Sequence, residues 1–195
     1  MSFEHYFSEK PDSDIKLNRF KVFLRNHTYQ FITSSGVFSS KKIDKGTSFL
    51  IENMKIPNNG LILDLGTGYG PIGIVIADLC PICKVHMIDI NERAVWLAKE
   101  NIILNNISNA SVFKSDLFDR IQENRYDLIV SNLPYTTGIK NIEKINELVL
   151  NHLTETGQYQ IVVPKQQARI ISHLESIFKN VEVFGKKGYK LVSCS

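Results

Sequence analysis

The sequence has few cysteines and no long apolar segment. Its three cysteines are an odd number, and their spacing does not indicate the disulfide network of a small secreted protein. We therefore expect a reducing, cytoplasmic environment. No apolar run approaches the roughly 18 residues that a membrane-spanning helix requires. The first residues also lack the basic and apolar regions of a signal peptide, so neither a membrane segment nor a signal peptide is predicted.

The cysteines do not indicate a metal site either. Cys80 and Cys83 form a C-x2-C pair, but a structural zinc site needs four ligands and no second pair is present. Cys194 and His86 are the only conceivable additional ligands. A redox pair of the thioredoxin kind would begin a helix, whereas this pair follows one. We interpret both cysteines as ordinary structural residues.

Charge is small in total but unevenly distributed. The net charge of +3 decides little by itself. Residues 1–55 carry nine basic and six acidic side chains, residues 56–163 eight and twelve, and residues 164–195 six and two. An acidic middle between two basic ends suits a catalytic core whose flanks face a polyanion. Solvated surface lysines would produce the same pattern.

The first 56 residues differ in pattern from the rest. Residues 19–33 contain two β-rich runs around a polar break at Asn26-His27, which indicates a hairpin. Residues 45–54 can form a short helix, and the loop 57–60 follows it. We predict an N-terminal extension over residues 1–56 and a second unit over residues 57–195.

From residue 61 onward, predicted strands alternate with predicted helices. The strands cover residues 61–65, 84–90, 111–114, 126–131 and 158–163, and the helices 71–79, 91–105, 142–153 and 166–178. Residues 181–184 and 189–194 flank a glycine-lysine turn and form a closing hairpin. This alternation predicts a doubly wound α/β fold with a mostly parallel, seven-stranded sheet, to which the hairpin adds an antiparallel strand.

A glycine-rich turn follows the first of these strands. It contains Asp64, Gly66, Thr67, Gly68, Tyr69 and Gly70. Glycines allow the backbone to approach a ligand closely. A dinucleotide-binding loop would have the spacing G-x-G-x-x-G, whereas here Pro71 stands where the last glycine should fall. The form D-x-G-x-G-x-G resembles the cofactor loop of class I S-adenosylmethionine methyltransferases. A carboxylate at Asp64 would repel a pyrophosphate but suits a sulfonium and an amino group.

Two further acids stand at the ends of the next two strands. Asp89 can accept hydrogen bonds from both ribose hydroxyls, and Ile90 follows it. In the fold that such methyltransferases share, an acid in the position of Asp116 accepts from the adenine amino group, and the adjoining Ser115 and Leu117 belong to the same site. Because the carboxyl ends of parallel strands share one edge of a sheet, we expect these residues and the glycine turn to form one site.

The fourth strand ends in Asn132-Leu133-Pro134-Tyr135. This resembles the tetrapeptide of methyltransferases that modify planar nitrogens. The lone pair of an exocyclic amine is delocalised, so the amine is a poor nucleophile. The Asn132 amide oxygen and the Leu133 carbonyl can accept its two N–H bonds, while Pro134 stiffens the turn and Tyr135 can stack on the base. Positioning and electrostatics then supply the rate. We predict these four residues as catalytic.

Three N-terminal stretches, 5–11, 35–39 and 44–50, resemble the opening of the methyltransferase small family. That family includes the catalytic halves of ribosomal RNA small-subunit guanine-N2 methyltransferases and short single-domain bacterial relatives. The resemblance covers nearly the whole chain and implies a class I, Rossmann-like fold with S-adenosylmethionine as cofactor. It also implies that Phe38, Gly46 and Thr47 close over the cofactor, and that Asn132 borders it.

The same resemblance implies ribosomal RNA or the small ribosomal subunit as partner, with a guanine amino group as substrate and no membrane or metal. The family usually has Asn-Pro-Pro, however, whereas Leu133 gives the form seen in ribosomal RNA adenine-N6 dimethyltransferases. A glutamine methyltransferase acting on release factors and a non-catalytic RNA-binding module also stay open. The flanking lysines Lys41, Lys42, Lys165, Lys186 and Lys187 could contact phosphates.

Overall fold

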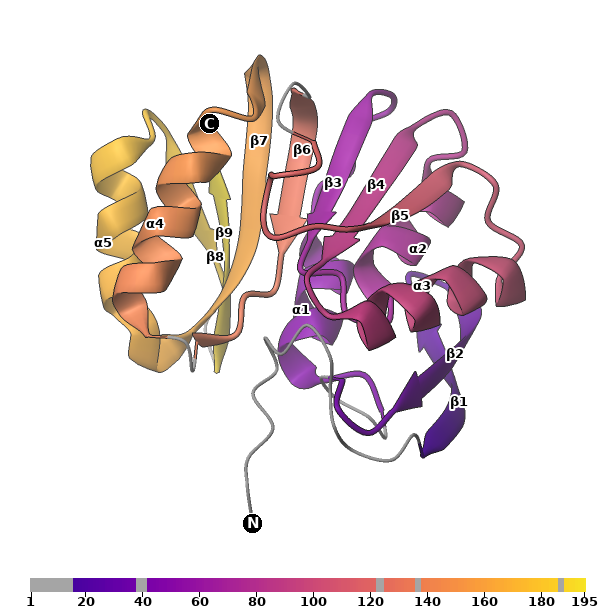
Figure 1. Ribbon diagram of the computed structural model, residues 1–195. Helices are drawn as coiled ribbons and strands as arrows, with labels where there is room; N and C mark the ends of the chain where they lie inside the picture. Colours follow the sequence, from indigo (N-terminus) through magenta and orange to yellow (C-terminus); the bar gives the residue numbers. More distant parts are fainter. Residues whose placement is uncertain (1–15, 38–41, 122–124, 136–137, 186–187) are drawn as a thin grey trace.

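The computed structural model describes residues 16–37, 42–121, 125–135, 138–185 and 188–195. Within these residues seven strands form one sheet (Figure 1). In spatial order they are β5 (Ala110–Lys114), β4 (Lys84–Asp89), β3 (Leu61–Leu65), β6 (Tyr126–Ser131), β7 (Leu153–Pro164), β9 (Tyr189–Cys194) and β8 (Val181–Phe184). Neighbouring strands are parallel, except that β9 runs antiparallel to both β7 and β8. The predicted doubly wound α/β fold is confirmed.

Helices cover both faces of the sheet. On one face lie α1 (Lys45–Asn53), α2 (Pro71–Leu79) and α3 (Glu92–Leu104), and on the other α4 (Ile139–Leu150) and α5 (Ala168–Ile177) (Figure 1). The strands therefore carry apolar residues on both sides. In β3, for example, Ile62 packs in the cluster beneath α2, while Leu63 packs in the cluster beneath α4 and α5. Four strands thus end along one edge, at Leu65, Asp89, Lys114 and Ser131.

Local sequence explains where most elements begin. Pro71 stands in the first turn of α2, where its missing N–H is no loss. Asn91 caps α3 by accepting from the backbone N–H groups of Arg93 and Ala94. The strand expected over residues 158–163 is longer, because Leu153 already pairs with Tyr126 across a register shift. The residues between Leu153 and Gln158 are mostly polar, so the sequence did not indicate a strand there. Because β7 begins at Leu153, α4 ends three residues earlier than expected.

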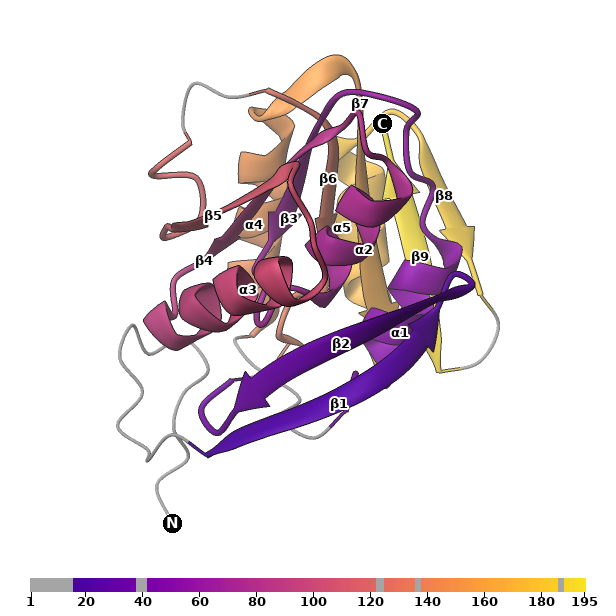
Figure 2. The same cartoon turned by 90° about the vertical axis from the view of Figure 1, so that its right-hand side faces the viewer.

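The predicted N-terminal hairpin is present and consists of β1 (Leu17–Leu24) and β2 (His27–Ser34) (Figure 2). The free edge of β2 is bonded to side chains of α3. Asn101 accepts from the Ile32 N–H at 2.7 Å and donates to the Ile32 carbonyl at 2.8 Å, and Asn105 does the same for Gln30 at 3.0 and 2.7 Å. Two amides one helical turn apart thereby replace a neighbouring strand. The hairpin packs in the same apolar cluster as α2, and the division at residue 56 stays a prediction.

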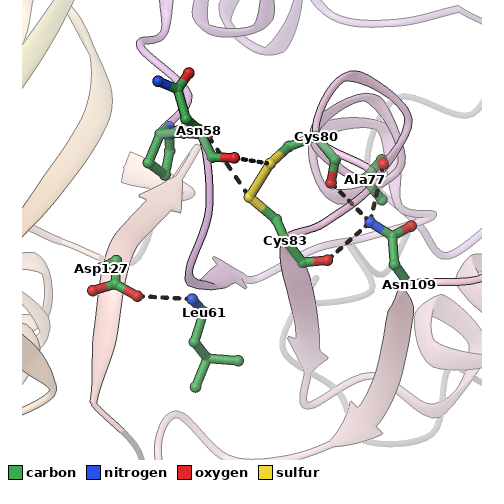
Figure 3. The surroundings of a disulfide bond; sticks show 8 residues. Asn58, Leu61, Ala77, Cys80, Cys83, Asn109 and Asp127 are labelled. Carbon is green, nitrogen blue, oxygen red and sulfur yellow. Dashed lines mark hydrogen bonds between the residues drawn. A yellow bond between two sulfur atoms is a disulfide. The ribbon is translucent and has the colours of Figure 1, made fainter.

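One expectation from the sequence was wrong: Cys80 and Cys83 form a disulfide (Figure 3). After α2 the chain turns, with the Cys83 N–H donating to the Cys80 carbonyl at 3.0 Å, so that the two Cα atoms lie 5.3 Å apart. Disulfides form readily at this separation. The Asn109 side chain holds the turn by donating to the carbonyls of Ala77, Cys80 and Cys83. The spacing of the cysteines did not reveal the bond, because a thiol pair and a disulfide share one sequence.

Two further properties concern only the described part of the chain. None of its helices is long and apolar enough to cross a membrane. Its His, Cys, Asp and Glu side chains also form no group of three or more that could hold a metal ion.

Candidate functional site

The glycine turn after β3 is an open, left-handed segment of backbone. Gly66, Gly68 and Gly70 have φ angles of 73°, 60° and 96°, a region that L-residues with side chains rarely occupy. The backbone N–H groups of Gly66 and Thr67 donate to the Ile88 carbonyl at 3.0 and 2.9 Å, which ties the turn to β4. A Cβ atom built on Gly66 would meet nothing within 4 Å. The backbone at Gly66 therefore borders open space.

Asp64 lies beneath this turn and is fully buried. Its Oδ2 accepts from the Thr67 hydroxyl at 2.6 Å and from the Gly73 N–H at 2.9 Å, so it shapes the turn and the start of α2. Its Oδ1 is buried and has no hydrogen-bond partner among the residues that the structure describes. Burial raises the pKa of Asp64 to about 7. A buried acceptor without a donor is an energetic cost that a cationic or N–H-bearing ligand, or a water, can offset.

Asp89 connects the ends of β3 and β4. It is buried, and its two carboxylate oxygens accept from the N–H groups of Gly68 and Asn91, each at 2.9 Å. The carboxylate is thereby held at the rim of a pocket, here called the first pocket. Its lining consists of Leu65, Gly66, Ile88, Asp89, Ile90, Ser115, Asp116, Leu117, Leu133, Pro134 and Ile145.

The first pocket combines apolar walls with two acids. Ser115 shapes its β5 side, since its hydroxyl donates to the Leu117 carbonyl at 2.8 Å and accepts from the Arg120 N–H at 3.1 Å. Leu117 takes a left-handed φ of 45° as a result of this tight loop. Asp116 is exposed. Such a pocket suits a flat apolar ring whose polar edge meets Asp116, with hydroxyl groups next to Asp89.

The second pocket adjoins the first at Gly66. It is lined by Asp44, Thr47, Gly66, Thr67, Gly68, Tyr69, Pro71, Ile72 and Asn132. Tyr69 also packs against the hairpin, with its ring 5.6 Å from that of Phe31 and 6.1 Å from that of Phe20. The hairpin thus supports the glycine turn from behind.

The four residues after β6 divide between these pockets and the core. Asn132 lines the second pocket, while Leu133 and Pro134 line the first. Tyr135 lines neither pocket; its hydroxyl donates to the Val162 carbonyl of β7, and burial raises its pKa. Stacking of Tyr135 on a base stays a prediction.

Residues of α1 approach Asn132 from the other side. The Asn132 Nδ2 donates to the Thr47 hydroxyl at 2.8 Å and lies 3.4 and 3.5 Å from the two carboxylate oxygens of Asp44. A Cβ atom on Gly46 would stand 3.1 Å from the Asp44 Oδ1 and 3.5 Å from the Asn132 Nδ2. Glycine at this position therefore permits the close approach of α1.

The structure brings together nearly all the predicted site residues, although Phe38 lies outside the described residues. Asp44 was not among them. Its place before a helix could have marked it as an N-cap, but its contact with Asn132, 88 residues away in sequence, has no sequence signal. Ile145 of α4 was missed as well, because nothing in its helix distinguishes it from other apolar residues.

The chain is similar to several known proteins. The family model described as "Methyltransferase small domain" matches residues 28–193. A Bacillus subtilis protein named "Uncharacterized protein YbxB" is 40% identical over 194 residues, covering 97% of this chain and 96% of its own length. "Ribosomal RNA small subunit methyltransferase C" of Hamiltonella defensa is 35% identical over 77% of this chain and 47% of its own length.

A solved structure shows the same fold. A T. thermophilus 16S rRNA N2 methyltransferase, in complex with AdoMet and guanosine, has a TM-score of 0.82 and 21% identity, covering 95% of this chain and 52% of that one. The chain therefore spans about half the length of the ribosomal RNA methyltransferases that it matches.

Proposed function

The chain belongs to the methyltransferase small domain family, and we propose that it transfers a methyl group from S-adenosylmethionine to the exocyclic N2 amine of a guanine in small-subunit ribosomal RNA. The observation that carries this proposal is the position of Asn132-Leu133-Pro134, which line both adjoining pockets at the end of β6. A group bound in the first pocket and a planar amine entering beside Asn132 would meet there.

The residues present fit the cofactor. The apolar first pocket suits its adenine, Asp116 its adenine amino group and Asp89 its ribose hydroxyls. The open backbone at Gly66 allows close approach, and the unpartnered Asp64 Oδ1 suits its cationic end, directly or through water. When bound, S-adenosylmethionine supplies an electrophilic methyl group.

The chain itself has to orient the amine. The Asn132 Oδ1 and the Leu133 carbonyl are the acceptors proposed for its two N–H groups. Hydrogen bonds accepted from both N–H groups withdraw the nitrogen lone pair from the ring and direct it towards the methyl group. Once the N–C bond has formed, the nitrogen releases one proton to solvent. This requires no strong general base, because preorganised acceptors provide the stabilisation.

An RNA substrate agrees with the exposed surface of the hairpin. Arg19, Lys21 and Phe23 alternate on the exposed face of β1, and Arg19 is oriented by a 3.2 Å hydrogen bond to Gln30. Cations at this spacing can contact phosphates, and an exposed aromatic ring can stack on a base. Lys42 and Lys165 are exposed as well, while Lys41, Lys186 and Lys187 lie outside the described residues. A ribosomal substrate would place the protein in the cytoplasm.

The test is methyl transfer from labelled S-adenosylmethionine to purified small ribosomal subunits and to naked ribosomal RNA, followed by nucleoside analysis. N2-methylguanosine would support the proposal. N6-methylated adenosine would show that the Leu133 form of the tetrapeptide sets the base. Label on a release-factor glutamine, or no label at all, would refute an RNA substrate. The variant Asn132→Ala tests the role of the amide. It should lose most of the turnover and keep its affinity for the cofactor.

A further inference from the structure

We propose that Asp44 and Thr47 are positioning residues that determine which end of the Asn132 amide is presented to the substrate amine. The role in methyl transfer rests on the proposed function, whereas the orientation of the amide does not. Neither residue touches the reacting atoms in this proposal, and both act through Asn132.

The N-terminus of α1 holds the two groups rigidly. Asp44 is the N-cap of α1, and its Oδ1 accepts from the N–H groups of Gly46 at 2.8 Å and Thr47 at 3.1 Å. Thr47 is buried, with 4% of its surface exposed. A capped helix terminus fixes both side chains. The Asp44 carboxylate is thereby a preorganised acceptor, and the Thr47 hydroxyl, which can accept or donate, holds the same group in place.

Chemistry decides the orientation of Asn132. The two ends of a side-chain amide have almost the same shape, and only their hydrogen bonds distinguish them. An ionised carboxylate can only accept. The end of Asn132 that lies 3.4 and 3.5 Å from Asp44 must therefore be the NH2 group. A reversed amide would place its oxygen against the carboxylate, with no proton between them.

The consequence is a free acceptor in the second pocket. The Asn132 Nδ2 is engaged by Thr47 and Asp44, while the Asn132 Oδ1 has no hydrogen-bond partner among the described residues. The negative charge of Asp44 also polarises the amide and makes this oxygen a better acceptor. A substrate amine needs such an acceptor, whereas an NH2 group in its place would repel the N–H bonds of the amine.

Conservative variants separate positioning from folding. Asp44→Asn keeps the shape and the N-cap, since Asn caps helices as well as Asp does. It can, however, pair with either end of the Asn132 amide, by accepting from its NH2 group or by donating to its oxygen. We expect kcat to fall about tenfold or more, because a charge-assisted contact selects the orientation, while the dissociation constant of the cofactor stays within about twofold. Thr47→Val should lower kcat in the same way, and Thr47→Ser should restore it. Ser48→Ala, which removes a neighbouring hydroxyl of α1, is the control with wild-type kcat.

A second readout does not depend on any substrate. The side-chain 15N–1H signals of Asn132 can be assigned by their absence in Asn132→Ala. In the wild type they should exchange slowly with solvent, and in Asp44→Asn and Thr47→Val they should shift and exchange faster. Unchanged signals would overturn the proposed orientation, and an unchanged kcat in Asp44→Asn would overturn its role in transfer. If the Asn132 signals behave as expected but the wild-type protein labels no RNA, the proposed function is refuted and the proposed orientation of the amide stands.

Discussion

The buried carboxylate of Asp64 makes the stability of this protein depend on pH in an unusual direction. Burial raises its pKa from 3.8 to about 7. Between these two values the folded protein holds a proton that the unfolded chain releases, so the folded state becomes less stable as the pH rises. The favourable contribution of the protonated Asp64 to the stability of the folded state is fully present below pH 3.8, and it is lost once the pH has risen through 7.

The magnitude follows from the size of this shift. A change from 3.8 to about 7 corresponds to roughly 4 kcal/mol, of which about 3 kcal/mol falls between pH 5 and pH 8. Asp64→Asn removes the titration and can still accept from Thr67 and Gly73. The free energy of unfolding should therefore decline with pH in the wild type by about 3 kcal/mol more than in the variant.

Urea unfolding of both proteins at pH 5, 6, 7 and 8 tests this expectation, because other titrating groups cancel in the difference between the two. A difference that is constant with pH would show that Asp64 ionises as an ordinary carboxyl group. Calorimetric titration with S-adenosylmethionine extends the test. A cationic ligand favours the ionised form, so the affinity of the wild type should rise with pH towards 7, by up to about tenfold per unit, relative to Asp64→Asn.

Three further outcomes are expected. Asp89→Ala removes the acceptor of the Gly68 N–H at the rim of the first pocket and should weaken cofactor binding about tenfold or more in the same titration; unaltered affinity would remove Asp89 from the site. Asn101→Leu leaves the bonded backbone groups of Ile32 and Tyr69 without partners and should lower the free energy of unfolding by about 3 kcal/mol; a loss below about 1 kcal/mol would mean that the hairpin needs no such anchor. Cys80 and Cys83 should resist alkylation in denaturant until a reductant is added, and prompt alkylation would contradict the disulfide. Reduction should cost about 2 kcal/mol or less, because the closed loop is short.

Local patterns in the sequence predicted most of the fold. The run of β3, apolar except for Asp64, is typical of a strand covered on both faces. The helices expected from residues 71 and 91 begin at Pro71 and Glu92. The β7 strand was underestimated, because its first half is polar and pairs through a register shift. The first half of β7 is a strand because it pairs with β6, and its own sequence does not indicate a strand.

The candidate site shows the same division. The glycine turn, the acid at the end of β4, the acid after β5 and the tetrapeptide after β6 could be predicted from the sequence, since parallel strands end at one edge of a sheet. The sequence could not show that Asp64 is buried beneath the turn with one oxygen unpartnered. It also could not show that Tyr135 bonds to β7. Burial and partners depend on which elements pack together.

By itself, the sequence determined the order of the elements and the chemical groups delivered to one edge of the sheet, because strand and helix periodicity and turn chemistry act over a few residues. Only the tertiary structure decided how those groups are held. The contact of Asp44 with Asn132 and the bonding of α3 to β2 join residues 88 and 69 positions apart. Such contacts form only when distant segments pack, and they decide the orientation of the Asn132 amide and the support of the glycine turn.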